Sequence, residues 1–300
     1  MSAGEPLQES HLHAATLQES GFPAIPADVP RAAPWGRLLT AEVRWVLLRP
    51  RTLVMLGLFA LIPVLIAIGV TVADRRPGPG RGLIGAVAGN GLVLPVVAMT
   101  VALALLLPMA VAMAAADAIA GEAASGTLRG LLLAPVSRLR LVGMKAFGVL
   151  VVAVAAVLAL AVVGVLAGVL VVGGNQLITL SGTTLGLGEA LGRVALVALW
   201  TVGQLAAVGA VALAVSAWTE HPLVVLAAVL GGLIVFGVLG AIPALEWLQP
   251  YLLTSGWSAG VDALRDPLPL TGMIDATWRA LCYMAIGATA TVARMLRRDA

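Results

Sequence analysis

Long apolar runs alternate with short charged stretches along most of this chain. Six runs have the length that a membrane-crossing helix needs, since about 20 residues at about 1.5 Å each span a hydrocarbon core of about 30 Å. They are Leu53–Ala73, Gly91–Ala116, Ala146–Val172, Val194–Thr219, Pro222–Leu245 and Ile274–Leu296. Barrel strands are shorter, about 10 residues, and alternate in polarity. The pattern therefore predicts an all-α membrane protein with six transmembrane helices.

The sixth run is the weakest of the set. Its uncharged part is only Ala280–Ala293, so Arg279 and Arg294 would have to reach opposite membrane surfaces with their long side chains.

Two further segments flank the runs without crossing. Trp35–Arg49 places apolar residues near helical spacing with Arg37, Glu42 and Arg44 between them, which predicts a helix lying in the membrane interface. Trp247–Leu264 is apolar but broken by Pro250 and Gly256. A re-entrant or surface hairpin on the outer side fits this segment, and so does a plain amphipathic loop.

Composition supports the membrane assignment. Hydrophobic residues make up 60% of the 300 residues and charged residues 11%, whereas soluble domains have roughly 45–50% and about 25%. The formal net charge is only +3, and no basic run is long enough to indicate nucleic acid binding. Residues 1–33 carry acidic residues and prolines without an apolar core, so we expect a disordered cytoplasmic tail rather than a signal peptide, with the membrane domain at 34–300.

Basic residues beside the runs predict the orientation, because cytoplasmic flanks are enriched in Arg and Lys. With the N-terminus inside, eleven basic residues are cytoplasmic: Arg37, Arg44, Arg49, Arg51, Arg129, Arg138, Arg140, Lys145, Arg294, Arg297 and Arg298. Six are outside: Arg75, Arg76, Arg81, Arg193, Arg265 and Arg279. We therefore expect a multi-pass protein of the plasma membrane with both termini cytoplasmic.

Small residues recur at four-residue spacing in two runs, as in Gly164-x-x-x-Gly168 and in Ala206, Ala210 and Ala214. This spacing allows helices to approach closely. Abundant Ala and Gly would produce the same spacing without any packing role, so both interpretations stay open.

Catalytic chemistry has little support in the sequence. The middle of each run lacks ionisable residues, which argues against a proton- or sodium-coupled carrier. The histidines are scattered and Cys282 is the one cysteine, so no metal site is predicted. The phosphate-binding loop of ATPases needs a lysine followed by Ser or Thr, but Lys145, the one lysine, precedes Ala146. We expect no enzyme activity and no cofactor bound by this chain.

The most informative stretch joins the second and third runs, residues 117–145. It combines Glu122, the Gly126-Thr127-Leu128 triplet, Pro135-Val136-Ser137-Arg138 and Gly143-Met144-Lys145. Ser137 can cap the helix that follows. This stretch resembles the signature of ABC-2 type permeases, the membrane subunits of ABC exporters, as do the six-run plan, the interfacial helix and the broken outer segment.

The resemblance implies the permease subunit of an exporter, and the apolar walls of the runs fit an amphiphilic or hydrophobic substrate. It implies three kinds of partner: a separate ABC ATP-binding subunit that uses the ATP, a second permease copy or a homologous permease, and membrane lipids. The ATPase would dock on the coupling loop between the second and third runs. The residues expected to form it are Glu122, Gly126, Thr127, Leu128, Arg129, Leu132, Pro135, Arg138 and Lys145. The alternative is a multi-pass channel or scaffold that needs no ATPase.

Overall fold

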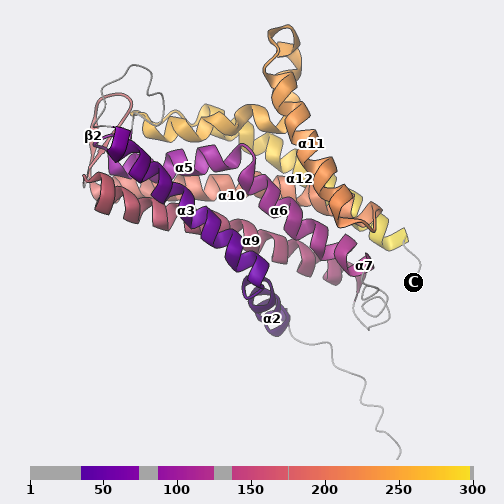
Figure 1. Ribbon diagram of the computed structural model, residues 1–300. Coiled ribbons are helices and arrows are strands. Elements are labelled where there is room, and N and C mark those ends of the chain that lie inside the picture. The colour runs from indigo at the N-terminus through magenta and orange to yellow at the C-terminus, as the bar shows by residue number, and fades with distance from the viewer. Residues whose placement is uncertain (1–34, 74–86, 125–136, 175, 298–300) are drawn as a thin grey trace, which may run out of the picture. The chain divides into compact units, whose positions relative to one another are not determined.

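The computed structural model describes residues 35–73, 87–124, 137–174 and 176–297. The predicted runs form helices with these bounds: α3 (Pro50–Ala73), α5 (Leu94–Leu103), α6 (Leu106–Ala116), α9 (Arg138–Ala167), α10 (Leu187–Trp218), α11 (Pro222–Gly240) and α12 (Thr271–Arg297). Figure 1 shows α3, α9 and α10 running side by side. The all-α prediction is confirmed for these residues, which contain just two short strands.

The predicted second span is not one continuous helix. A 3₁₀ turn, η1 (Gly91–Val93), leads into α5. The helix is then interrupted at Ala104–Leu105 before α6 starts. Leu105 leaves helical geometry with φ −152° and ψ −44°. The cause is Pro108, because a proline has no N–H for the carbonyl four residues earlier and its ring clashes with that carbonyl. The carbonyl concerned belongs to Ala104.

Five helices in the described part of the chain are long and apolar enough to cross a membrane: Pro50–Val72, Leu106–Ala124, Arg138–Val172, Leu187–Trp218 and Pro222–Gly240. Gly91–Leu103 is apolar but shorter. The helix expected as the sixth span, α12, does not meet this standard, because Asp275 and Arg279 lie in its first turns and Arg294 and Arg297 in its last. Six crossings therefore stay a prediction.

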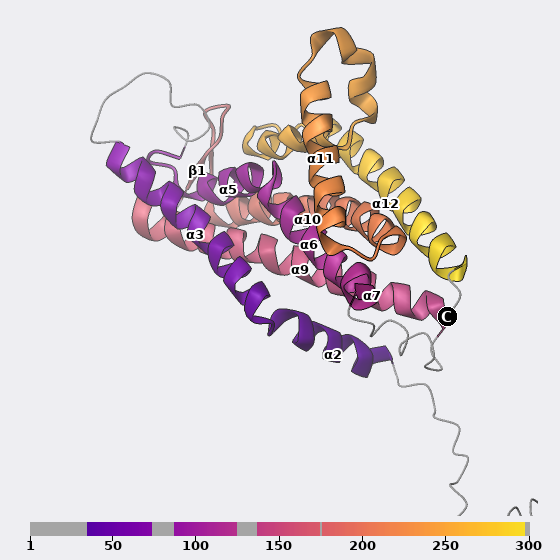
Figure 2. The same cartoon turned by 45° about the vertical axis from the view of Figure 1, so that its right-hand side comes forward.

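Helices α9 and α10 form the centre of the bundle. Helix α9 packs on α3, α5 and α6, and α10 packs on α12, α9 and α6. Leu160 of α9 and Leu205 of α10 are fully buried. By contrast, α3 and α11 lie at the periphery and expose large apolar side chains, such as Leu58 and Leu223 (Figure 2). Such faces are stable in lipid, which replaces water as their solvent.

The small-residue seam predicted on α9 is confirmed. A Cβ atom placed on Gly164 would lie 2.8 Å from Cα of Pro95, and one placed on Gly168 would overlap the carbonyl of Gly91. On α10, Ala210 faces Gly287 of α12, where an added Cβ would lie 2.5 Å from the Ala210 carbonyl carbon. The spacing therefore brings helix backbones into contact at these points.

A glycine turn and a short β-hairpin lie at the end of the bundle where α9 finishes. The π-helix η3 (Gly168–Val172) ends at Gly173, whose φ of +87° suits glycine. A hairpin of β1 (Leu177–Ile178) and β2 (Thr184–Leu185) follows, pairing in antiparallel register. The side chain of Asn90 donates to the Ile178 carbonyl at 2.6 Å and accepts from the Ile178 amide at 3.2 Å. This clamp holds the hairpin against η1.

The broken segment before α12 is helical. It forms two 3₁₀ helices, η4 (Pro243–Tyr251) and η5 (Leu253–Leu264). Trp257 and Leu264 of η5 are buried where η5 packs on α12, α10, α5 and α11. The plain-loop alternative is wrong for this segment, and a re-entrant position in the membrane stays a prediction.

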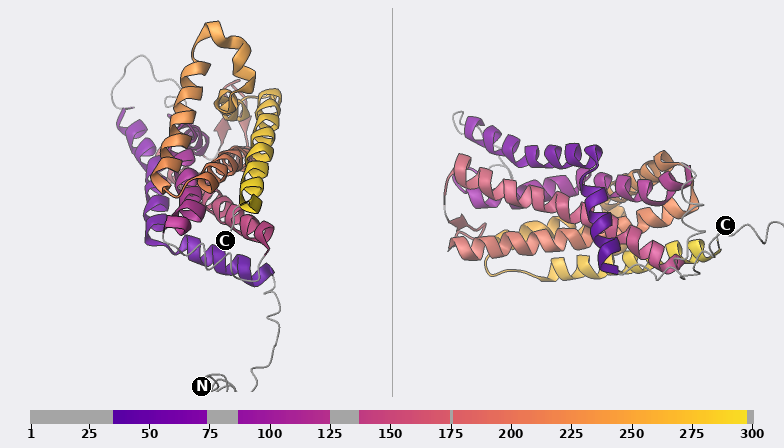
Figure 3. Two further views of the ribbon diagram at one scale, coloured as in Figure 1. Left: turned by 90° about the vertical axis from the view of Figure 1, so that its right-hand side faces the viewer. Right: turned by 90° about the horizontal axis from the view of Figure 1, so that it is seen from below.

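The predicted amphipathic helix before the first span is confirmed as α2 (Trp35–Leu47). It packs on α9, with Val46 buried, and it runs across the direction of the long helices (Figure 3). This places α2 at the same end of the bundle as α7 (Glu122–Ala124) and the end of α12. The β-hairpin lies at the opposite end.

Candidate functional site

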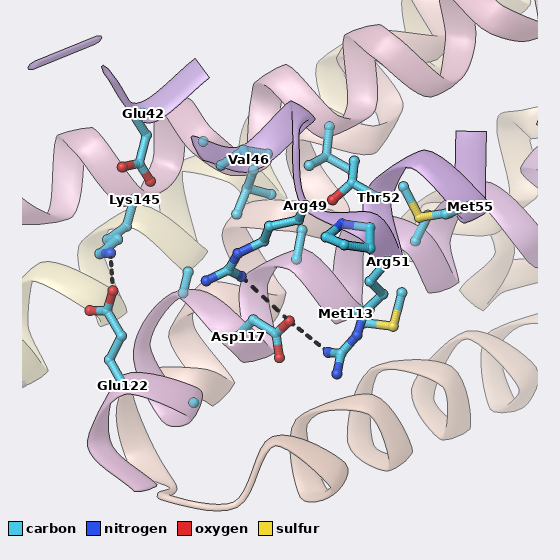
Figure 4. Close-up of a pocket in the computed structure, with 18 residues that line it drawn as sticks. Glu42, Val46, Arg49, Arg51, Thr52, Met55, Met113, Asp117, Glu122 and Lys145 are labelled. Atoms are coloured by element: carbon cyan, nitrogen blue, oxygen red, sulfur yellow. Dashed lines mark hydrogen bonds and ion pairs between the residues drawn. The ribbon is translucent and has the colours of Figure 1, made fainter. Parts of the chain in front are cut away.

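Charged side chains from four elements meet at the end of the bundle that holds α2 and α7. They come from α2, the start of α3, the turn that follows α6, and the first part of α9. Figure 4 shows them around one pocket. Two groups can be distinguished, one centred on Lys145 and the other on Asp117.

The first group is built on an ion pair between Lys145 and Glu122. The pair is well shielded, with 7% of the lysine side chain and 15% of the glutamate side chain exposed. Glu42 of α2 approaches the same lysine from the other side (Figure 4). It can come this close because the neighbouring residue on α9 is Gly148, where a Cβ would lie 3.0 Å from Oε1 of Glu42.

Burial raises the pKa of Glu42 above its ordinary value. The ammonium of Lys145 opposes this rise, the carboxylate of Glu122 adds to it, and the guanidinium of Arg49 opposes it. Desolvation is the largest cause, because a carboxylate that leaves water loses hydration that its neighbours replace only in part.

The second group pairs Asp117 with two arginines. Its Oδ2 lies 2.9 Å from Nη1 of Arg51 and 3.8 Å from Nη1 of Arg49. The aspartate opens a π-helix, η2 (Asp117–Gly121), in which backbone groups leave the regular helical ladder. One of them, the Ala120 amide, donates to the hydroxyl of Ser216 on α10 at 3.0 Å. The arginines thus connect the start of α3 to a turn that is itself fixed to α10.

Both groups line a cavity of about 880 Å³. Its charged side chains are those of Glu42, Arg49, Arg51, Asp117, Glu122 and Lys145. Its apolar wall includes Met55, Met113, Val149 and Val152. Ligand pockets typically combine such an apolar lining with a few placed polar groups.

Of the residues predicted for the coupling loop, three are described by the structure. Glu122 and Lys145 are brought together as the ion pair. Arg138 lies elsewhere and donates to the carbonyls of Met295 and Leu296 at 2.9 and 3.1 Å, so it caps the end of α12. The other six lie outside the described residues: Gly126, Thr127, Leu128, Arg129, Leu132 and Pro135.

Ser137 caps α9 as predicted, accepting from the Arg140 amide at 3.3 Å. The sequence did not indicate the Asp117 group or the part that Glu42 takes in the site. A usable signal existed, because Arg49, Arg51 and Asp117 all flank predicted spans on the same predicted side of the membrane. Opposite charges at one membrane surface are candidates for contact.

No cluster of three or more His, Cys, Asp and Glu residues suited to a metal ion occurs in the described residues. The charged site instead consists of two groups of ion-paired side chains that line a partly apolar cavity.

Comparison with models of known protein families gives a match. Residues 48–216 match the sequence model of a family described as ABC-2 family transporter protein. That range includes α3, both ends of the predicted coupling loop and nearly all of α10. A search of curated proteins finds no match.

Proposed function

The chain belongs to the ABC-2 family of transporter proteins, and from this premise we propose that it is the permease subunit of an ATP-driven exporter, powered by a separate ATP-binding subunit that docks at residues 117–145. The substrate would be an amphiphilic or hydrophobic molecule, because the spanning helices offer almost wholly apolar surfaces.

The observation that carries the proposal is how both ends of this loop are attached to the bundle. On one side, Glu122 is paired with Lys145 of α9. On the other, Arg138 at the start of α9 holds the last carbonyls of α12. The turn before Glu122 is bonded to α10 through Ser216. A force applied to the loop would therefore reach α6, α9, α10 and α12 together.

ATP hydrolysis is assigned to another chain because these 300 residues lack the lysine-containing phosphate loop. A second permease copy, or a homologous permease, would complete the transporter. Placing the loop in the cytoplasm follows from the basic residues that flank the spans.

A channel or scaffold without an ATPase is the competing function. A pore would favour polar side chains along the helices, whereas the buried polar side chains of α10 are those of Thr201, Gln204 and Ser216, each at most 1% exposed. Apart from Lys145, the buried residues of α9 are all apolar.

The test is to purify the tagged chain from its native membrane and identify co-purifying proteins. We expect a second polypeptide with a complete phosphate-binding loop, ATPase activity in the complex, and none above background in the chain alone. Recovery of the chain without any ATP-binding partner, under conditions that preserve other transporter complexes, would favour the channel or scaffold.

A matched pair of variants locates the docking surface. Gly126→Trp changes the predicted loop, while Gly57→Trp changes an exposed glycine of α3 with no atom within 4 Å of an added Cβ. We expect the first to reduce recovery of the ATPase at least tenfold and the second to leave it unchanged. Equal recovery from two well-folded variants would place docking elsewhere.

A further inference from the structure

Two side chains in the interior of the bundle carry polar atoms that no other described group satisfies. Gln204 of α10 is 1% exposed, and Trp257 of η5 is 7% exposed. Among the described residues, Oε1 of Gln204 and Nε1 of Trp257 are buried without a hydrogen-bond partner. Buried polar groups are almost always hydrogen-bonded, because burial removes the water that would otherwise satisfy them. Both atoms therefore need a partner that these residues do not provide.

The contact between α10 and η5 shows which faces of the two segments meet. Near the start of α10, Arg193 donates to the carbonyl of Ala263 at 3.3 Å. Further along α10, a Cβ placed on Gly260 would lie 3.1 Å from the ring of Trp200 and 3.8 Å from the side chain of Val197. The two segments therefore run in opposite directions, since residue numbers fall along η5 as they rise along α10.

The same spacing brings Gln204 and Trp257 to one level. Gln204 follows Trp200 by four residues, so it lies on the face of α10 that contacts η5. Trp257 precedes Gly260 by three residues, and side chains three residues apart share a face in a 3₁₀ helix. One 3₁₀ turn and four residues of an α-helix each advance about 6 Å. Trp257 and Gln204 therefore face the same part of the contact.

The two unsatisfied atoms are chemically complementary. An indole N–H donates a hydrogen bond, and the amide oxygen of glutamine accepts one. A hydroxyl group between them would satisfy both, because it accepts from Trp257 and donates to Gln204. A carbonyl group cannot donate to Gln204, and an ammonium group cannot accept from Trp257. The pair therefore favours a hydroxyl over either of these groups.

We propose that Gln204 and Trp257 bind one hydroxyl group between α10 and η5, which belongs to a buried water molecule or to an amphiphilic alcohol. Gln204 lies near the middle of α10. If α10 crosses the membrane, the site lies at the depth of the acyl chains, where an alcohol with a hydrocarbon chain can reach it. An alcohol that is also the transported molecule would rest on the proposed export function, but binding of the hydroxyl needs no ATPase and is tested on this chain alone.

The first experiment asks whether the two groups share one partner. The melting temperature of the full-length protein in lipid nanodiscs is measured for Gln204→Leu, Trp257→Phe and the double variant. When a hydroxyl joins the two groups, Gln204→Leu removes one of its bonds and should lower the melting temperature. In the Trp257→Phe background the shared partner is already lost, so the same substitution removes an unsatisfied oxygen and should raise the melting temperature.

Repeating this cycle with decanol in the membrane identifies the source of the hydroxyl. A reversal of sign without decanol indicates a buried water, and a reversal that requires decanol indicates the alcohol. Decyl methyl ether accepts hydrogen bonds but cannot donate them, so it should produce no reversal of its own, and a reversal that it produced would contradict a hydroxyl. If Gln204→Leu raises the melting temperature in both backgrounds, with and without decanol, the proposal is wrong.

Trp200→Phe is the matched control background, because the Trp200 indole already donates to the carbonyl of Met273 at 3.1 Å. In that background Gln204→Leu should keep its wild-type effect. A high-resolution density map of the unsubstituted protein in lipid tests the site even if the variants fail to fold. It should show a bound group between Nε1 of Trp257 and Oε1 of Gln204. A direct bond between these two atoms, or the lack of any density between them, would overturn the proposal.

Discussion

Gly91 and Gly168 bring two segments together with no side chain between them. An added Cβ on either residue would overlap the other's carbonyl oxygen. Other glycines in the same bundle have no such role, since Gly57, Gly69 and Gly232 have nothing within 4 Å of an added Cβ. The importance of a glycine here therefore depends on its neighbour and not on its being in a helix.

Substituting Gly168 with Ala should destabilise the protein by about 3 kcal/mol, the upper part of the usual range for overpacking, because backbone rather than a side-chain end must move. Gly57→Ala is the matched control and should be neutral or stabilising by up to about 1 kcal/mol, since alanine favours the helix. Thermal unfolding in detergent measures both. Similar melting temperatures for the two variants would contradict the close contact.

Glu42 gives the protein a pH dependence whose sign can be stated. Because burial raises its pKa in the folded state, the folded protein binds more protons at this residue than the unfolded chain does. Stability should then fall as pH rises from the ordinary carboxyl pKa through the raised folded pKa. Glu42→Gln should stabilise the protein at neutral pH, and the stability of this variant should depend less on pH over this range.

The measurement is the melting temperature of both proteins across the acidic to neutral range in one detergent. Glu189→Gln, at an exposed site, is the control and should keep the wild-type profile. A Glu42→Gln variant that melts below the wild type at every pH would show that the carboxylate stabilises the fold.

At the scale of elements, two prolines have different effects on the helices that contain them. Pro63 lies inside α3, which continues through it, while Pro108 lies in the first turn of α6, just after the break between α5 and α6. Helices that contain apolar runs could be predicted from the sequence, because length and hydropathy decide membrane insertion. The break between α5 and α6 could not be predicted, because Pro63 and Pro108 have similar apolar neighbours in the sequence. They differ in packing, since α3 is peripheral and α5 and α6 are buried.

The same difference explains which parts of the candidate site could be predicted. Glu122 and Lys145 were found through a local motif, although the sequence did not predict that they contact each other. The pairs of Asp117 with Arg49 and Arg51 join residues far apart in the chain. They depend on how η2 turns Asp117 toward α3, which no local pattern specifies.

The Glu122–Lys145 pair is an interaction between elements, and its loss should be costly. Lys145→Met leaves a largely buried carboxylate without its ammonium, which we expect to cost about 3–5 kcal/mol. The double variant Glu122→Gln, Lys145→Met should recover much of that loss, as a double-mutant cycle in thermal unfolding would measure. Arg265→Met, which removes an ion pair with side chains 59% and 32% exposed, should cost under about 1 kcal/mol. Equal effects of the two single variants would contradict the buried pair.

At the scale of the whole domain, described over residues 35–297, charge and hydrophobicity are distributed unequally. The centre is formed by α9 and α10, and the periphery by α3 and α11. The two ends differ as well: one carries the Lys145 and Asp117 groups, the other the β-hairpin. The two ends of the domain therefore present different surfaces.

Helix α10 allows the predicted orientation to be tested. Its 32 residues extend about 48 Å, longer than the hydrocarbon core, so Thr184 and Glu220 should lie on opposite sides. In a Cys282→Ser background, which removes the exposed native thiol, Thr184→Cys should react with a membrane-impermeant maleimide in intact cells and Glu220→Cys should not. The reverse pattern would invert the orientation, and labelling of both would exclude the crossing.

The contact between Gly91 and Gly168 also limits which substitutions the protein can accept and which second substitutions can compensate for them. A clash between two side chains can be relieved by trimming either one, so a defect caused by Gly209→Ala is open to second-site suppression at Val149 or Val111, whose methyl groups lie 2.9 and 3.2 Å from an added Cβ. At Gly168 the opposing atoms belong to the main chain, where no codon change removes them. A suppressor screen starting from Gly168→Ala should therefore return true revertants, whereas one starting from Gly209→Ala should also return smaller residues at its two valine neighbours.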